Sequence, residues 1–286
     1  MHRIIHRLLA ALLPVITVLS ANAQTNTMEK ANTTGHAPVN GISMYYEIYG
    51  SGNIPLVLIH GGGSTIESSF GALLPLLSGY GKIIAVELQA HGRTSDRNAP
   101  ESFTQDADDV AALLQYLKID KANILGFSNG ASTTLQIAIR HPEVVNKIVV
   151  ISAAFRRDGF IPGFFEGMQH ATLDNMPAPL KEAFLKVTPD KDKLLAMFNK
   201  DRERMQHFKD WSDEAVKSIK APALVMASDH DVITVAHTQQ IAQLIPGAQL
   251  AILPGIHGAF IGEICTAEKG SKLPEVTATL VKEFLK

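Results

Sequence analysis

Seven short apolar runs recur along the chain, each about the length of a β-strand. They are rich in Val, Ile and Leu, and most are nearly continuous rather than alternating with polar residues, which is typical of strands covered on both faces. The runs occupy residues 42–49, 55–60, 82–88, 123–127, 148–153, 223–228 and 249–254. We therefore expect a sheet buried between two layers.

Between several of these runs, apolar residues follow a helical spacing instead. Val110, Leu113 and Leu117 repeat at three- and four-residue intervals, and Val276 and Leu280 do so behind a proline suited to the first turn of a helix. Strand and helix in alternation predict an α/β fold with a mostly parallel central sheet and helices on both faces.

One segment breaks this alternation. Residues 156–220 contain no strand-like run, and four prolines divide them into helix-like pieces. The segment is too long for a plain connection, so we expect a helical cap inserted into a single domain that spans residues 39–286. It holds six of the twelve phenylalanines, four of the eight methionines and the only tryptophan. Such side chains favour an apolar pocket under the cap.

The beginning of the chain predicts export. Residues 1–23 combine Arg3 and Arg7, an apolar stretch over residues 8–19 and a small-residue cleavage site that ends at Ala23. The alternative, an uncleaved anchor, is disfavoured because the apolar stretch is short for a membrane span. Residues 24–38 are rich in Thr and Asn and predict a flexible linker. We expect a periplasmic or secreted protein with no stable membrane association after cleavage.

Composition and charge exclude some classes of function. A chain of 286 residues with 46% apolar and 19% charged residues can bury one large core. The net charge is −2, and the 26 basic and 28 acidic residues are mixed, so nucleic acid is not an expected partner. A small molecule is the expected partner, while the oligomeric state stays open. The single cysteine cannot form an internal disulfide.

A G-x-S-x-G motif supplies a candidate nucleophile. It spans Gly126 to Gly130 with Ser128 at its centre, directly after one strand-like run and directly before a helix-like segment. A serine on a strained strand-to-helix turn exposes its hydroxyl, and small residues two positions before and after it avoid backbone clashes. Ser128 is therefore the predicted nucleophile.

A second motif, His60-Gly61-Gly62-Gly63, closes an earlier strand-like run. Glycines at this place let backbone N–H groups face a substrate, and a second donor follows the nucleophile. We predict an oxyanion hole made by Gly62 and Asn129, with Gly62 preferred to Gly63. His60 precedes this loop, so a structural hydrogen-bonding role is favoured over a role as base.

The base and the acid are expected to follow the serine in the order acid, then histidine. His257 lies just after the last strand-like run, and Asp229 and Asp231 lie just after the run before it. Loop position favours Asp231 as the acid, with Asp229 and Asp158 as alternatives. No helical His-x-x-x-His or cysteine-rich arrangement surrounds these residues, so we expect no metal and no cofactor.

Together these segments resemble a known family. The succession HGGGS, VELQAHGRTSD, GFSNG, ASDHD and PGIHG is similar to that of the α/β-hydrolases that include small carboxylesterases, enol-lactonases and cofactor-free haloperoxidases. The resemblance covers residues 39–286. Ala90 departs from the family's usual glycine in the VELQAHGRTSD segment, which suggests a slightly different turn.

The resemblance implies the α/β-hydrolase fold and a serine hydrolase. We expect cleavage of a carboxylic ester or lactone of a small to medium apolar substrate through an acyl-enzyme on Ser128. Other reactions on the same triad remain open: a perhydrolase or haloperoxidase, a C–C bond hydrolase or an amidase. A non-catalytic hydrolase-like binding protein is the remaining alternative.

Overall fold

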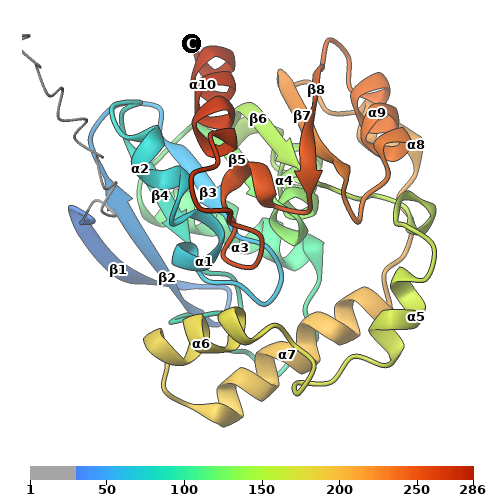
Figure 1. Ribbon diagram of the computed structural model, residues 1–286. Helices are drawn as coiled ribbons and strands as arrows, with labels where there is room; N and C mark the ends of the chain where they lie inside the picture. Colours follow the sequence, from blue (N-terminus) through green and yellow to red (C-terminus); the bar gives the residue numbers. More distant parts are fainter. Residues whose placement is uncertain (1–29) are drawn as a thin grey trace, which may run out of the picture.

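The computed structural model describes residues 30–286, so the predicted signal segment and residues 24–29 of the predicted linker lie outside the described residues. One eight-stranded sheet forms the centre of the molecule, in the order β1-β2-β4-β3-β5-β6-β7-β8 (Figure 1). The strands are β1 (Thr33–Val39), β2 (Ile42–Tyr49), β3 (Leu56–Ile59), β4 (Ile83–Val86), β5 (Ala122–Phe127), β6 (Val145–Ile151), β7 (Ala223–His230) and β8 (Gln249–Ile256).

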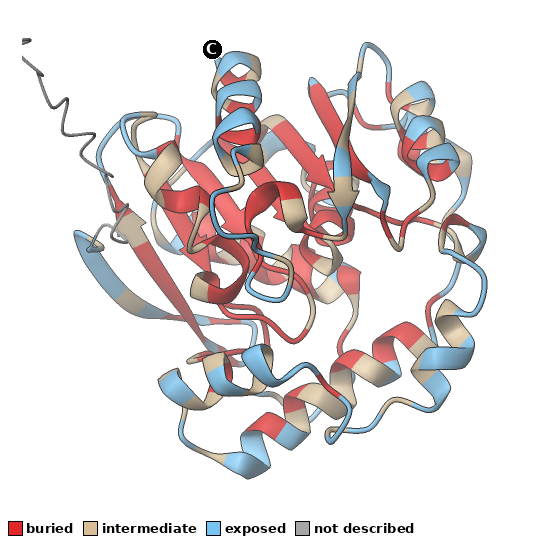
Figure 2. Ribbon diagram, viewed as in Figure 1, coloured by how far each residue is buried: buried red, intermediate tan, exposed pale blue. Residues whose placement is uncertain are grey.

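The sheet is mostly parallel, as predicted. Strands β4, β3, β5, β6, β7 and β8 are each parallel to their neighbours, whereas β2 pairs antiparallel with both β1 and β4. All seven apolar runs overlap strands β2 to β8. The interior strands β3, β4 and β5 are buried along their whole length (Figure 2), which explains why their sequences are apolar without alternation.

The prediction of a flexible linker is wrong for residues 33–38, because β1 occupies them. β1 pairs antiparallel with β2 from Thr33 opposite Ile48 to Val39 opposite Ile42. It is an edge strand in which only Ala37 and Val39 are buried, so its sequence is polar. Asn40 and Gly41 both have positive φ, as a two-residue hairpin turn requires. The Asn-Gly pair was the sequence signal for this strand.

Helices cover both faces of the sheet. On one face, the apolar residues of the strands pack against α1 (Ile66–Phe70), α2 (Leu73–Leu77) and α10 (Leu273–Leu285). On the other face, they pack against α3 (Phe103–Tyr116), α4 (Asn129–Arg140), α8 (Asp213–Lys217) and α9 (Val235–Leu244). Two apolar layers thus enclose the sheet, and these layers hold the strand ends and loops in place.

The segment between β6 and β7 crosses the carboxyl end of the sheet. It contains α5 (Phe164–Gln169), α6 (Ala178–Val187) and α7 (Lys191–Gln206), which lie below the sheet in Figure 1. The segment predicted as a cap also includes α8, but α8 contributes Val216 to the layer that contains α4 and α9. We therefore apply the name cap to α5, α6 and α7. Within residues 30–286, no helix has the length and apolarity needed to span a bilayer.

Candidate active site

Ser128 occupies the turn between β5 and α4. Its backbone has φ +55° and ψ −119°, a conformation that a residue with a Cβ adopts only under strain. The glycines on either side explain why this turn closes. A Cβ on Gly126 would lie 2.1 Å from the Gly130 carbonyl oxygen, and a Cβ on Gly130 would lie 2.2 Å from the Ile59 carbonyl oxygen. Both positions therefore require glycine.

His257 follows the edge strand β8, which β6 and β7 separate from β5, and its side chain reaches the serine turn across the carboxyl ends of these strands. Its Nε2 lies 3.0 Å from the Ser128 Oγ, and its ring packs on Phe127 with the centroids 4.8 Å apart. Gly258 comes next, with φ +78°, and a Cβ there would lie 2.9 Å from the Phe127 ring. The tight turn and the ring contact together aim the imidazole at the serine.

Asp231 follows β7 and holds the other side of the imidazole. Its Oδ1 lies 2.6 Å from the His257 Nδ1, while its Oδ2 accepts a hydrogen bond of 2.6 Å from the Ser152 hydroxyl. Burial alone would raise the pKa of Asp231, but the hydrogen bonds from His257 and Ser152 hold it below its usual range. An ionised carboxylate keeps the proton on Nδ1, so Nε2 is left to accept a proton from Ser128.

The structure brings Asp231, rather than the two alternatives, to His257. Asp229 is exposed, accepts a hydrogen bond of 2.8 Å from the Gly255 N–H, and pairs with His230. Asp158 is exposed in a short 3₁₀ turn after β6. Asp229, near the end of β7, thus helps to hold the end of β8 and does not contact His257.

The two predicted oxyanion donors lie beside Ser128. Gly62 and Asn129 line the same cavity as the serine, and neither backbone N–H donates to another atom of residues 30–286. The Gly63 N–H, by contrast, donates to the carboxylate of Asp201 on cap helix α7. Gly62 and Asn129 therefore keep their N–H groups available to a ligand, whereas Gly63 does not.

His60 has a structural role in this arrangement. It is fully buried, its Nε2 accepts a 3.0 Å hydrogen bond from the Leu88 N–H, and its Nδ1 lies 2.7 Å from the Gly61 carbonyl. Burial lowers the pKa of His60 to about 3, so the ring is neutral. It ties the glycine loop to the loop after β4. In that second loop, Ala90 has φ +62°, the left-handed conformation that glycine adopts more easily.

A cavity of about 350 Å³ lies between the strand ends and the cap. Ser128 and His257 line it, and ten of the other lining side chains are Phe, Met or Leu. These apolar residues are Phe103, Phe160, Phe164, Met168, Met176, Leu180, Met197, Phe198, Met205 and Phe208. Among the described residues, no group of three or more His, Cys, Asp or Glu side chains is arranged to hold a metal ion. The chamber suits an apolar ligand with a single polar reacting group.

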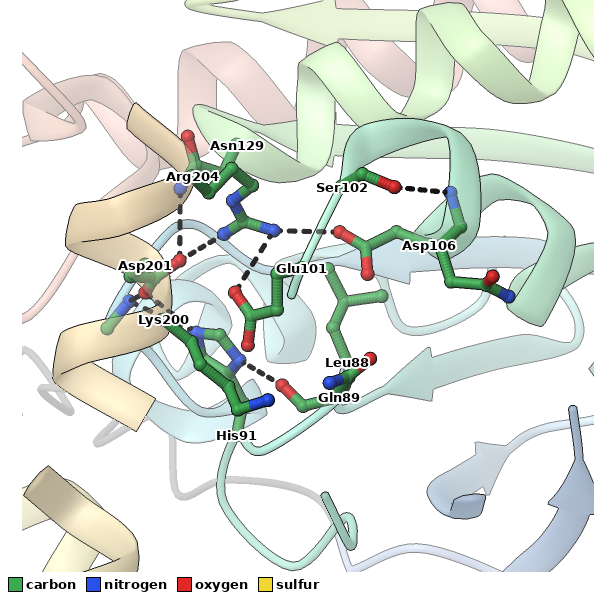
Figure 3. A network of polar contacts seen from close by, with 12 residues as sticks. Leu88, Gln89, His91, Glu101, Ser102, Asp106, Asn129, Lys200, Asp201 and Arg204 are labelled. Carbon is green, nitrogen blue, oxygen red and sulfur yellow. Dashed lines mark hydrogen bonds and ion pairs between the residues drawn. The ribbon is translucent and has the colours of Figure 1, made fainter. Parts of the chain in front are cut away.

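Sequence reasoning missed two features of this site. Ser152, at the end of β6, has φ +59° and hydrogen-bonds Asp231. Its place directly after a strand was the available signal. The second feature is a buried group of charged residues between the cap and the glycine loop, which we call the charged cluster: His91, Glu101, Asp106, Asp201 and Arg204 (Figure 3). No local motif in the sequence connects these five residues.

Known proteins resemble this chain in sequence and in fold. A family profile described as "alpha/beta hydrolase fold" matches residues 54–185. Serine hydrolase BPHL of Homo sapiens is 25% identical over 261 residues, which cover 86% of this chain and 87% of that protein. A solved structure of a serine hydrolase involved in carbazole degradation superposes with a TM-score of 0.72 at 22% identity. That alignment covers 88% of this chain and 98% of the other.

A further relative matches over a shorter stretch. The dihydrolipoyllysine-residue acetyltransferase component of the acetoin cleaving system of Cupriavidus necator is 30% identical over 135 residues. The match covers 47% of this chain and 36% of that protein. It therefore concerns one part of a longer protein.

Proposed function

We propose that this chain, which has the α/β-hydrolase fold, is a serine hydrolase that cleaves a carboxylic ester or lactone through an acyl-enzyme on Ser128. One observation carries the proposal. His257 stands between the Ser128 hydroxyl, at 3.0 Å, and the Asp231 carboxylate, at 2.6 Å. Nucleophile, base and orienting acid at these distances are the parts that acyl transfer needs.

The reaction follows from this geometry. His257 Nε2 takes the Ser128 proton as Oγ attacks the acyl carbon, and Asp231 stabilises the imidazolium that forms. The negative oxygen of the tetrahedral intermediate accepts hydrogen bonds from the N–H groups of Gly62 and Asn129. Such donors act only in the transition state and typically contribute on the order of 10²–10³ each in rate. His257 then protonates the leaving oxygen and later activates a water molecule that releases the acyl group.

The cavity supports the substrate class. Its apolar walls favour a small or medium apolar acyl or aromatic group, and the cap helices α5, α6 and α7 supply much of this lining. The names of two similar proteins, both serine hydrolases, support the serine mechanism for this chain as well.

Fluorophosphonate labelling tests the class of mechanism. We expect the mature protein to be labelled covalently at Ser128 and Ser128→Ala to be unlabelled while retaining the melting temperature of the wild type, since one hydroxyl at a turn is lost. An unlabelled wild type would instead favour a non-catalytic binding protein.

A substrate panel then separates reactions on the same triad. The panel compares kcat/KM for a matched ester, lactone and amide and for a ketone whose C–C bond would be cleaved. It also includes peracid formation from a carboxylic acid and hydrogen peroxide. We expect the ester or the lactone to have the highest value. An amide, a C–C substrate or peracid formation in first place would reassign the reaction while keeping the triad.

We also propose that the protein is exported. The basic start and short apolar stretch of residues 1–23 support this location. N-terminal sequencing of the protein recovered from its native host should begin at Gln24, and an intact Met1 in the cytoplasm would contradict export.

A further inference from the structure

Asp201, on cap helix α7, contacts both chain segments that carry the proposed oxyanion donors. Its Oδ2 accepts the Gly63 N–H, one residue after Gly62. Its Oδ1 lies 3.4 Å from the side-chain Nδ2 of Asn129. The side chain of a single cap residue thus contacts both the glycine loop and the serine turn, which follow the adjacent strands β3 and β5.

The Asp201 carboxylate is held in place by two cations. Arg204, one turn further along α7, donates to Oδ1, and His91 Nε2 lies 2.9 Å from Oδ2. The His91 Nδ1 lies 2.8 Å from the Gln89 carbonyl, which can only accept, so both ring nitrogens donate and the ring is a cation. The Gly63 N–H is 3.3 Å from His91 Nε2, but a protonated nitrogen cannot accept it.

Electrostatics explains why such a carboxylate needs cations beside it. A bare negative charge at this depth would repel the oxyanion that develops at Gly62 and Asn129, and its desolvation would be costly. Burial alone would raise the pKa of Asp201, but His91 and Arg204 hold it well below its usual range. Arg204 in turn pairs with Asp106 at 2.8 Å. The cluster therefore presents a fixed, compensated acceptor to the glycine loop.

The packing around Gly62 leaves little room for the loop to move. A Cβ on Gly62 would lie 2.5 Å from the Asn129 Nδ2 and 3.3 Å from the Asp201 Oδ2. The rate contribution of an oxyanion donor depends on its position, and a misplacement of about 1 Å can cost on the order of 10²-fold in rate. The position of the glycine loop is therefore set by contacts with the cap as well as by the sheet.

We propose that Asp201 is a positioning residue that sets the geometry of the oxyanion hole and makes that geometry depend on the docked cap. The inference rests on the proposed function, because it concerns the donors for a serine-centred reaction. Asp201 touches no reacting atom. It acts through the Gly63 N–H and the Asn129 side chain. Because the Gly63 N–H donates to Asp201, the Gly62 N–H is the one in the glycine loop that can donate to the oxyanion.

The test compares two carboxylates of the charged cluster. Asp201→Asn removes one acceptor oxygen from the contact with the glycine loop, whereas Asp106→Asn removes a partner of Arg204 that does not touch that loop. Both variants disturb the buried ion pairs, so both should lower the melting temperature. We expect kcat on a short p-nitrophenyl ester to fall at least tenfold in Asp201→Asn at a KM within about threefold of wild type, because the lost interaction belongs to the transition state. Asp106→Asn should keep kcat within about threefold.

The possible outcomes either support or overturn the positioning role of Asp201. Equal losses of kcat in the two variants, or a folded Asp201→Asn with wild-type kcat, would overturn it and leave the charged cluster with a structural role alone. A wild type that neither reacts with fluorophosphonate nor turns over any ester overturns the proposed function and the inference with it. A wild type that does both, beside an unaffected Asp201→Asn, overturns the inference alone.

A second variant covers the case in which Asp201→Asn does not fold. His91→Gln keeps an amide donor for the Asp201 carboxylate but removes the positive charge beside it. We expect kcat to fall about three- to tenfold with KM unchanged, since the less compensated carboxylate opposes the oxyanion. A folded His91→Gln with wild-type kcat would contradict the positioning role.

Discussion

The loops that follow β5, β7 and β8 place Ser128, Asp231 and His257 mainly through backbone conformation, whereas the cap reaches the same site through buried charges and apolar side chains. On the sheet side, Gly126 and Gly130 leave no room for a Cβ, and Ser128 has a strained φ. On the cap side, Asp201 and Arg204 of α7 are buried among ionised partners, next to walls of Phe and Met.

This difference suggests that the sheet side determines the chemistry and that the cap determines the selectivity for substrate. Backbone turns fixed by glycines and a buried sheet give the triad one geometry, which acyl transfer requires. Side-chain contacts across a cap can change by single substitutions, so the cap can vary in substrate size while the triad stays in place. Asp201 is the exception, because it connects the cap to the glycine loop on the sheet side.

The largest expected effect lies on the sheet side, at the acid. Asp231→Asn should lower kcat by up to on the order of 10⁴, because an amide no longer holds His257 in the tautomer that accepts the serine proton. Asp229→Asn is the matched control, since Asp229 is exposed, bonds the Gly255 N–H and the adjacent His230, and does not contact His257. Its kcat should stay within about threefold of the wild type. Steady-state kinetics of both variants on one ester measures these losses. A larger loss of kcat in Asp229→Asn than in Asp231→Asn would assign the role of the acid to Asp229.

A pair of glycine substitutions compares the two regions by stability. Gly130→Ala should destabilise the fold by at least about 3 kcal/mol, because the new Cβ would lie 2.2 Å from the Ile59 carbonyl oxygen. Gly167→Ala, in cap helix α5, meets nothing within 4 Å and should stabilise by roughly 0.5–1 kcal/mol through helix propensity. Urea unfolding measures both. Similar free energies of unfolding for the two variants would contradict the idea that the serine turn is sterically closed.

The sheet side is also where sequence reasoning succeeded. Strands β2 to β7 are mostly buried, so their runs of Val, Ile and Leu were visible as a nearly unbroken pattern. The edge strand β8 has no buried residue but kept enough apolar residues to be recognised, and the glycines around Ser128 are required by local geometry. The edge strand β1 was missed because only Ala37 and Val39 face the core. A polar edge strand lacks the apolar signal on which strand prediction depends.

The cap's charged cluster could not be predicted for a different reason. Asp201 and Arg204 stand three residues apart in a highly charged segment, a pattern that usually indicates a solvated helix face. Their burial depends on His91, Glu101 and Asp106, about a hundred residues earlier in the chain. Pairing over such a distance is a property of the folded chain, and no local periodicity or motif reports it.

The charged cluster should make stability depend on pH. Burial raises the pKa of Glu101 to about 8 from an ordinary value near 4.5. Burial alone would lower the pKa of His91, but Asp201 raises it to about 9 from 6.5. Both groups bind a proton more tightly in the folded protein, so the stability they contribute is complete below their unfolded pKa values and is lost as pH rises through the folded ones.

The free energy of unfolding should therefore fall by up to about 1.4 kcal/mol per pH unit for each group. The fall due to Glu101 lies between about pH 4.5 and 8, and the fall due to His91 lies between about pH 6.5 and 9. Glu101→Gln removes the Glu101 contribution and should flatten the decline, while His91 still titrates. The exposed variant Glu275→Gln serves as a control and should follow the wild type. Melting temperatures across this range measure the effect, and identical slopes in wild type and Glu101→Gln would contradict a protonated Glu101.

The smallest expected effect concerns substrate size, and it depends on the apolar walls of the cap. Each methylene that fits the cavity should contribute up to about 0.8 kcal/mol of binding, so kcat/KM on p-nitrophenyl esters should rise over the first few acyl carbons. It should then fall when the chain meets the cap, because the cavity holds about 350 Å³ and cap residues form part of its wall. Phe198→Ala, which shortens a lining side chain of α7, should shift the optimum to longer esters, whereas Leu195→Ala on the exposed face of the same helix should not. Activity that keeps increasing toward long-chain esters or emulsified triglyceride in the wild type would contradict a size limit set by the cap and would indicate an open, lipase-like groove.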